Sequence, residues 1–179
     1  AAEAIDPGTD IYYKGAWILH TLRHQIGDRA FRASMRMLVY GRTDPRPGNF
    51  KPRYATSQDY VDAVNRITGR DWNWFFDVYL HSAVMPRLDV ERTGGKLKLR
   101  WVTEGNRPFP LPVEVRVGER KLRVPMARGH GEVAIAANES YTIDPDNMVL
   151  RDAPEIAAWK ADAAARAKAA AEKAGQGKR

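Results

Sequence analysis

Residues 85–101 read Met-Pro-Arg-Leu-Asp-Val-Glu-Arg-Thr-Gly-Gly-Lys-Leu-Lys-Leu-Arg-Trp, and this stretch decides the fold. After Pro86 the spacing of apolar residues changes from nearly four positions to two, since Leu88 and Val90 alternate with acidic residues. Gly94-Gly95 marks a turn, and the alternation resumes at Leu97, Leu99 and Trp101. We therefore expect helices before this point and antiparallel strands after it.

The alternation continues beyond residue 101. Val113, Val115 and Val117 share one face of a predicted strand, and further short strands are expected near residues 122–124, 133–135 and 141–143. Five to seven short strands at this spacing are typical of a small antiparallel β-sandwich. We expect it to occupy residues 86–150.

Helical spacing dominates residues 9–82. Apolar residues predict one helix that ends at Gly27, and Asp28 is expected to cap a second. A loop rich in proline and glycine follows over residues 41–54. Thr56 is expected to cap a third helix and Asp71 a fourth, which predicts a helical bundle.

The end of the chain is rich in alanine, with 12 alanines in residues 153–174. Pro154 suits the first turn of a C-terminal helix, which Ile156 and Trp159 would dock onto the body. The predicted fold class is therefore α+β. It comprises a helical region over 1–85, a β-sandwich over 86–150 and a helical tail over 151–179.

Composition restricts the functional classes. The 179 residues carry a net charge of +7, and the excess is spread along the chain, which argues against nucleic-acid binding. The absence of cysteine excludes disulfides and thiolate metal sites. No apolar run is long enough for a membrane span, so a soluble protein is expected. The chain starts without methionine and shows no signal peptide, which leaves its compartment open and suggests a processed form or a piece.

Local motifs alone do not indicate an activity. His20 and His24 lie four positions apart, a spacing that suits metal ligands on one helix face. The glutamate of the H-E-x-x-H pattern is missing after His20, and no third ligand is evident, so packing or surface roles are expected. The segment 144–147, Asp-Pro-Asp-Asn, is interpreted as a turn rather than a calcium loop.

An ordered series of segments resembles the M1 family of zinc metallopeptidases, the aminopeptidase family. The series begins with Ile-Tyr-Tyr-Lys-Gly-Ala at 11–16 and continues with Gly-Asp-x-x-Phe at 27–31. It goes on with Ala-Thr-Ser-Gln-Asp-Tyr at 55–60, Thr-Gly-x-Asp-x-x-x-Phe-Phe at 68–76, Phe-Pro-Leu-Pro-Val-Glu-Val at 109–115 and Ile-Asp-Pro-Asp at 143–146. The resemblance covers residues 9–150 and implies the end of a catalytic helical domain followed by a β-sandwich.

The resemblance implies one catalytic residue, Tyr12, the tyrosine of the family's Tyr-x-Lys-Gly segment. In the family its phenol stabilises the oxyanion formed when zinc-bound water attacks a peptide carbonyl. Tyr13 points about 100° around the helix and cannot share this role. The H-E-x-x-H pair and the downstream glutamate are missing, so this chain is expected to hold no metal and no cofactor and to be inactive alone. Zinc, the peptide substrate and the upstream catalytic domain would belong to the parent enzyme.

Two alternatives remain open. The first is a non-catalytic M1-like scaffold or protein-interaction module, and the second is an unrelated binding protein built from helices and a sandwich. Separation from an upstream domain would also leave apolar helix surface exposed. We therefore expect a dimer or another contact between copies through Ile11, Trp17 or Ile18.

Overall fold

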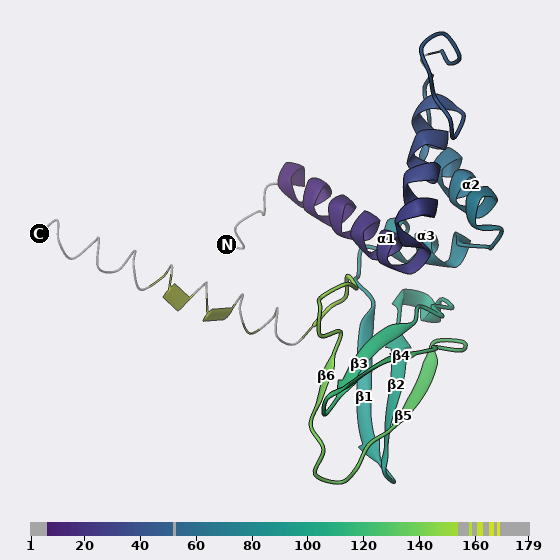
Figure 1. Cartoon of the computed structure of the whole chain (residues 1–179). Helices are drawn as coiled ribbons and strands as arrows, with labels where there is room; N and C mark the ends of the chain where they lie inside the picture. Colours follow the sequence, from purple (N-terminus) through teal and green to yellow (C-terminus); the bar gives the residue numbers. More distant parts are fainter. Residues whose placement is uncertain are drawn as a thin grey trace, which may run out of the picture.

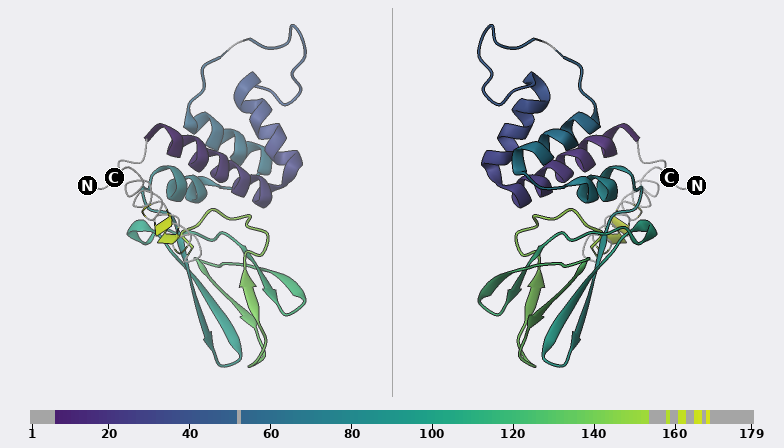
Figure 2. Two further views of the ribbon diagram at one scale, coloured as in Figure 1. Left: turned by 90° about the vertical axis from the view of Figure 1, so that its left-hand side faces the viewer. Right: turned by 90° about the vertical axis from the view of Figure 1, so that its right-hand side faces the viewer.

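The computed structural model describes residues 7–51 and 53–153, and also positions 158, 161, 162, 165, 166 and 168. This part of the chain has the α+β composition expected from the sequence. Its three helices are α1 (Pro7–Tyr40), α2 (Ser57–Thr68) and α3 (Asn73–Leu80). They lie at one end of two small β-sheets (Figures 1 and 2).

The two helices expected on either side of Gly27 are the two segments of α1, which is kinked there. Gly27 has φ 80° and ψ 159°, a conformation that interrupts the helix and is essentially restricted to glycine. The expectation that Asp28 caps the second segment was wrong. Among the described contacts its carboxylate binds Arg23 at 2.6 Å and Arg32 at 3.2 Å rather than a backbone amide.

The other two helix starts follow the sequence signals more closely. Thr56 caps α2 in a reciprocal capping box with Asp59, and Gly69 ends the helix with φ 64°. Asp71 accepts from the amide of Asn73 at 2.9 Å, although Trp72 occupies the cap position of α3. The large apolar side chains of α3 and of the residue before it are buried, as Trp72, Phe75, Phe76 and Tyr79 all belong to the core.

Six short strands form two antiparallel sheets of three strands each. The first sheet has the order β1 (Arg87–Thr93), β2 (Lys96–Val102) and β5 (His130–Ala134). The second has the order β4 (Arg120–Val124), β3 (Val113–Val117) and β6 (Tyr141–Ile143), and a short 3₁₀ helix spans Glu104–Asn106. Gly94-Gly95 joins β1 to β2 as a two-residue turn, and both glycines have positive φ.

One hydrophobic core connects the helices and the sheets. The alternation predicted from the sequence is present, because the inward residues of β2 and β3 are buried while their neighbours face solvent. Residues of α1, α2 and α3 belong to the same cluster of buried side chains as those of both sheets. The position of the helices is therefore fixed by apolar packing against the end of the sheets.

Two parts of the expected architecture are not established. Over residues 7–51 and 53–153 the structure has three helices, one of them kinked, and this arrangement does not by itself define a helical bundle. The predicted C-terminal helix, with Ile156 and Trp159, lies outside the described residues apart from isolated positions. Within the described part of the chain, no helix has the length and apolarity needed to cross a membrane.

Candidate functional site

Tyr12 lies on the first segment of α1 with its side chain 79% exposed. Tyr13 is 66% exposed and Trp17 43% exposed, so several large aromatic side chains of this segment face outward. Ile18 is only 3% exposed, so its expected contact with a second copy was wrong, because it belongs to the core. The side chain of Ile11 lies outside the described residues.

An open apolar hollow of about 360 Å³ lies beside the first segment of α1. Gly15 and Leu19, three and seven positions after Tyr12, line it, whereas Tyr12 itself is not among its lining residues. The hollow lies between the two segments of α1 and the facing surfaces of α2 and α3. Its other lining residues are Ile18, Met35, Leu38, Ala55, Thr56, Ser57, Tyr60, Phe76 and Leu80.

Tyr60, on the wall of this hollow, is a packing residue. Its hydroxyl is buried and has no hydrogen-bond partner among the described atoms. Burial raises the pKa of the phenol, so the hydroxyl stays protonated at neutral pH. Of the two tyrosines beside the hollow, only Tyr12 presents its side chain to solvent.

Two positively charged side chains bind backbone carbonyls at the carboxyl end of α3, next to the first segment of α1. Lys14 Nζ donates to the carbonyl oxygen of Ser82 at 3.1 Å. Arg107 donates to the carbonyl oxygens of Asp77 at 2.8 Å and His81 at 3.0 Å. Positive groups are favourable at the carboxyl end of a helix, where backbone carbonyls lack partners.

His20 and His24 have separate partners. The ring of His20 packs edge-on against Trp17, with 5.3 Å between ring centroids, whereas His24 Nε2 lies 3.7 Å from Glu114 Oε1. Among the described residues, no group of three histidine, aspartate or glutamate side chains is arranged to hold a metal ion.

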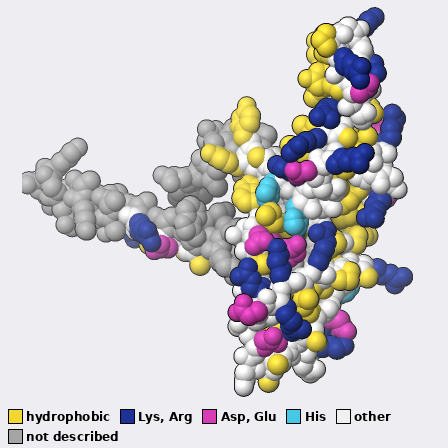
Figure 3. Space-filling view, viewed as in Figure 1, with side chains coloured by type: hydrophobic (Ala, Val, Ile, Leu, Met, Phe, Trp, Pro, Cys, Tyr) yellow, Lys and Arg dark blue, Asp and Glu magenta, His cyan; other side chains and the backbone are white. Residues whose placement is uncertain are grey.

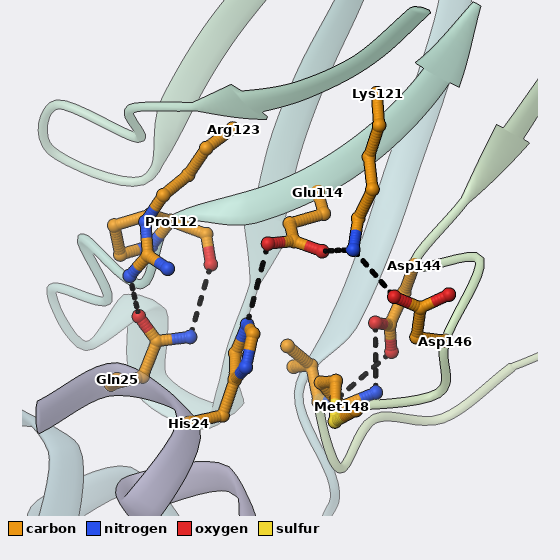
Figure 4. A network of polar contacts seen from close by, with 10 residues as sticks. His24, Gln25, Pro112, Glu114, Lys121, Arg123, Asp144, Asp146 and Met148 are labelled. Carbon is orange, nitrogen blue, oxygen red and sulfur yellow. Dashed lines mark hydrogen bonds and ion pairs between the residues drawn. The ribbon is translucent and has the colours of Figure 1, made fainter. Parts of the chain in front are cut away.

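Around His24, a polar network joins α1 to the second sheet (Figure 4). Glu114 Oε2 binds Lys121 Nζ at 2.6 Å, and Lys121 also binds Asp146. The hydrogen bond from Lys121 lowers the pKa of Asp146. Gln25 bridges the carbonyl oxygen of Pro112 and the guanidinium of Arg123. The network joins α1 to the second sheet. Alternation alone did not single it out, because its strand residues Glu114, Lys121 and Arg123 occupy outward positions on β3 and β4.

Charged side chains of both signs are interspersed over the face of the molecule shown in Figure 3. On the first sheet, cross-strand ion pairs join Lys96 to Glu132 and Arg100 to Asp89. This face resembles an ordinary solvated surface rather than a basic stripe.

No protein-family model matches the chain, and comparison with curated proteins gives no match. Among solved structures, the fold is similar to that of Legionella pneumophila aminopeptidase A, determined in complex with aspartic acid. The TM-score is 0.51 at 16% sequence identity, over 73% of this chain. The match spans only 16% of the Legionella chain. At this level of identity the similarity concerns the fold, and this chain has the fold of one part of a much longer peptidase.

Proposed function

We propose that this chain is the C-terminal part of an M1-like zinc metallopeptidase that acts as an aminopeptidase. The observation that carries the proposal is the exposure of Tyr12 on α1, three positions before Gly15, which lines an open apolar hollow. The ordered series of family-like segments and the fold similarity to a longer aminopeptidase support it.

In this proposal Tyr12 is the catalytic residue that the chain contributes. Its neutral phenol, carried on a helix that is anchored in the core, would donate a hydrogen bond to the oxyanion that forms during peptide hydrolysis. One such preorganised donor contributes roughly 3–4 kcal/mol to transition-state stabilisation. In this proposal the zinc ion would be held by the upstream catalytic domain of the parent protein, as the resemblance to the family implies.

The apolar hollow would be covered by the upstream catalytic domain in the parent protein. An exposed apolar concavity of this kind is typical of a surface that is buried in a larger assembly. In the isolated chain Trp17, 43% exposed, remains available for contact with a second copy. Light scattering that shows a monomer at every concentration would remove the self-association part of the proposal.

The decisive experiment replaces Tyr12 with phenylalanine in the full-length product of the gene. We expect turnover of a peptide substrate to fall about 100- to 1000-fold, as for loss of one oxyanion donor, while zinc content is unchanged. Tyr13→Phe on the adjacent position is the matched control and should keep its activity. Unchanged turnover in Tyr12→Phe would remove Tyr12 from the mechanism.

A non-catalytic scaffold is the second candidate. It is favoured by the group of outward aromatic side chains, Tyr12, Tyr13 and Trp17, which would also suit a binding surface. Zinc analysis and a peptidase assay on the full-length product separate the two functions. A degenerate H-E-x-x-H segment upstream, with no zinc and no hydrolysis, would favour the scaffold.

A further inference from the structure

We propose that Lys14 is a positioning residue, which holds the first segment of α1 against the end of α3 so that Tyr12 faces away from that contact. This inference rests on the function proposed for Tyr12. Its structural part, the anchoring of the helix, can be tested without any activity.

The need for an anchor follows from the burial of this segment. Tyr12, Tyr13, Ala16 and Trp17 are exposed, and Ile18 is the first fully packed side chain of α1 with a described environment. Only Lys14 and Gly15 are partly buried before it. Among the described side chains of residues 12–17, the hydrogen bond from Lys14 to Ser82 is the polar contact that reaches another element.

The acceptor, the carbonyl oxygen of Ser82, lies in a well-packed part of the molecule. Ser82 is buried, and its hydroxyl contacts Glu104 Oε2 at 2.7 Å, which links it to the 3₁₀ helix. Arg107 binds the neighbouring carbonyl oxygen of His81, and Tyr79 on the preceding turn is in the centre of the core. A hydrogen bond to the carbonyl oxygen of Ser82 therefore ties Lys14 to a well-packed element.

Because Lys14 and Tyr12 lie on the same helical segment, a contact that fixes the direction of Lys14 also fixes the direction of Tyr12. Successive residues are rotated by about 100°, so Tyr12 and Lys14 lie about 200° apart and point to opposite sides. When Lys14 is bound to Ser82 at the end of α3, Tyr12 points away from that contact, in agreement with its large exposure. Tyr12 makes no comparable contact of its own among the described residues, so its direction depends on the rest of the segment.

Hydrogen exchange on the 179-residue chain tests the anchor. In Lys14→Met the amides of residues 14–18 should exchange on the order of 3- to 10-fold faster, because a charge-assisted hydrogen bond is lost at a partly exposed site. Lys14→Arg keeps a donor and should restore most of the protection, and Lys14→Gln provides a second variant if the methionine variant fails to fold. Lys96→Met removes the same charge from the first sheet and should leave these amides unchanged. Equal exchange in Lys14→Met and the unmodified chain would overturn the inference.

Kinetics of the full-length product tests the effect on Tyr12. Lys14→Met should lower kcat with KM and zinc content unchanged, and Lys14→Arg should recover most of kcat. If Tyr12→Phe lowers turnover but Lys14→Met does not, the positioning role is wrong and the proposed function survives. If Tyr12→Phe has no effect, the proposed function fails, while the exchange experiment still decides whether Lys14 anchors the helix.

Discussion

The hydroxyl of Tyr79 donates to the carbonyl oxygen of Leu150 at 2.6 Å, across 71 positions of sequence. The amide of the same Leu150 donates to the hydroxyl of Thr21 at 2.9 Å. The backbone amide and carbonyl groups of Leu150, which follows β6, are thus both hydrogen-bonded to side chains, one from α1 and one from α3. Tyr79 and Thr21 are fully buried, so these bonds lie where an unpaired polar group is costly.

Replacement of Tyr79 by phenylalanine should destabilise the chain by ~1–3 kcal/mol, because it leaves the carbonyl oxygen of Leu150 without this donor. The ring and its packing are retained, so the change isolates the hydroxyl. Tyr141→Phe, at a partly exposed position of β6, is the control and should change the free energy of unfolding by less than about 0.5 kcal/mol. Urea denaturation measures both, and equal stability of the two variants would contradict the prediction.

Thr21→Val should cost a similar ~1–3 kcal/mol, because the amide of Leu150 then lacks its acceptor inside the protein. Thr21→Ser keeps the hydroxyl and removes one methyl group, so it should be the more stable of the two variants. Thermal denaturation at fixed protein concentration ranks them. A serine variant that is less stable than the valine variant would show that packing of the methyl group, and not the hydrogen bond, dominates at this position.

Gly131→Ala should destabilise the chain by about 1–3 kcal/mol through overpacking. A Cβ atom at this position would lie 2.6 Å from Met126 Sδ, 2.8 Å from the carbonyl oxygen of Pro125 and 2.8 Å from Val124 Cγ1. The loop after β4 therefore passes too close to β5 for a side chain. The exposed neighbour Glu132→Ala serves as control, and urea denaturation in which both variants match the unmodified chain would refute the explanation.

Gly27→Ala should also lower stability, by about 1–3 kcal/mol, because φ 80° and ψ 159° are accessible essentially only to glycine. Here the cause is backbone strain, since a Cβ atom would meet nothing within 4 Å. Gly15→Ala, in the first segment of α1 and equally free of close contacts, should instead stabilise by up to about 1 kcal/mol. Circular dichroism during thermal unfolding compares the two, and a change of the same sign in both would count against the kink as the cause.

Asp89 should contribute a pH-dependent part of the stability. Hydrogen bonds from Arg87 and then Arg100 lower its pKa. A lowered pKa in the folded state means that the contribution is present above the ordinary carboxyl pKa of about 3.9 and is lost as the pH falls through the folded-state value. The stability difference between the unmodified chain and Asp89→Asn should therefore be largest at neutral pH and shrink below about pH 4.

Urea titrations between pH 7 and pH 2.5 measure this difference. The other carboxylates titrate alike in both proteins, so the comparison isolates Asp89. Because the ion pairs are partly exposed, the difference should also diminish at high salt. A difference that is constant over the whole pH range would contradict the assignment.

Local signals in the sequence anticipated most of the elements. Thr56 and Asp59 lie three positions apart, and this spacing alone specifies the capping box that starts α2. Gly94-Gly95 between two alternating runs specifies a hairpin. These features depend on neighbouring residues and on backbone conformation, so the sequence carries them directly.

The sequence was less reliable where a side chain chooses between local and distant partners. Aspartate is a residue type favoured at the start of a helix, yet the carboxylate of Asp28 is bound by Arg23 and Arg32. Ile18 was expected to contact a second copy, yet it is in the core because α1 packs against α2. Whether a side chain binds a local or a distant partner depends on how the helices are arranged. No single segment of the sequence specifies that arrangement.

By itself the sequence determined the α+β composition and the change from helix to strand at Pro86, since the spacing of apolar residues is a property of short segments. Tyr12 became a candidate only because its segment resembles that of a known family. Only the tertiary structure decided that Tyr12 faces outward, that Lys14 reaches Ser82 and that Leu150 is held by Thr21 and Tyr79. These relationships join residues up to 129 positions apart. They exist because apolar burial brings the helices against the end of the sheets, and polar groups trapped there must find partners across that contact.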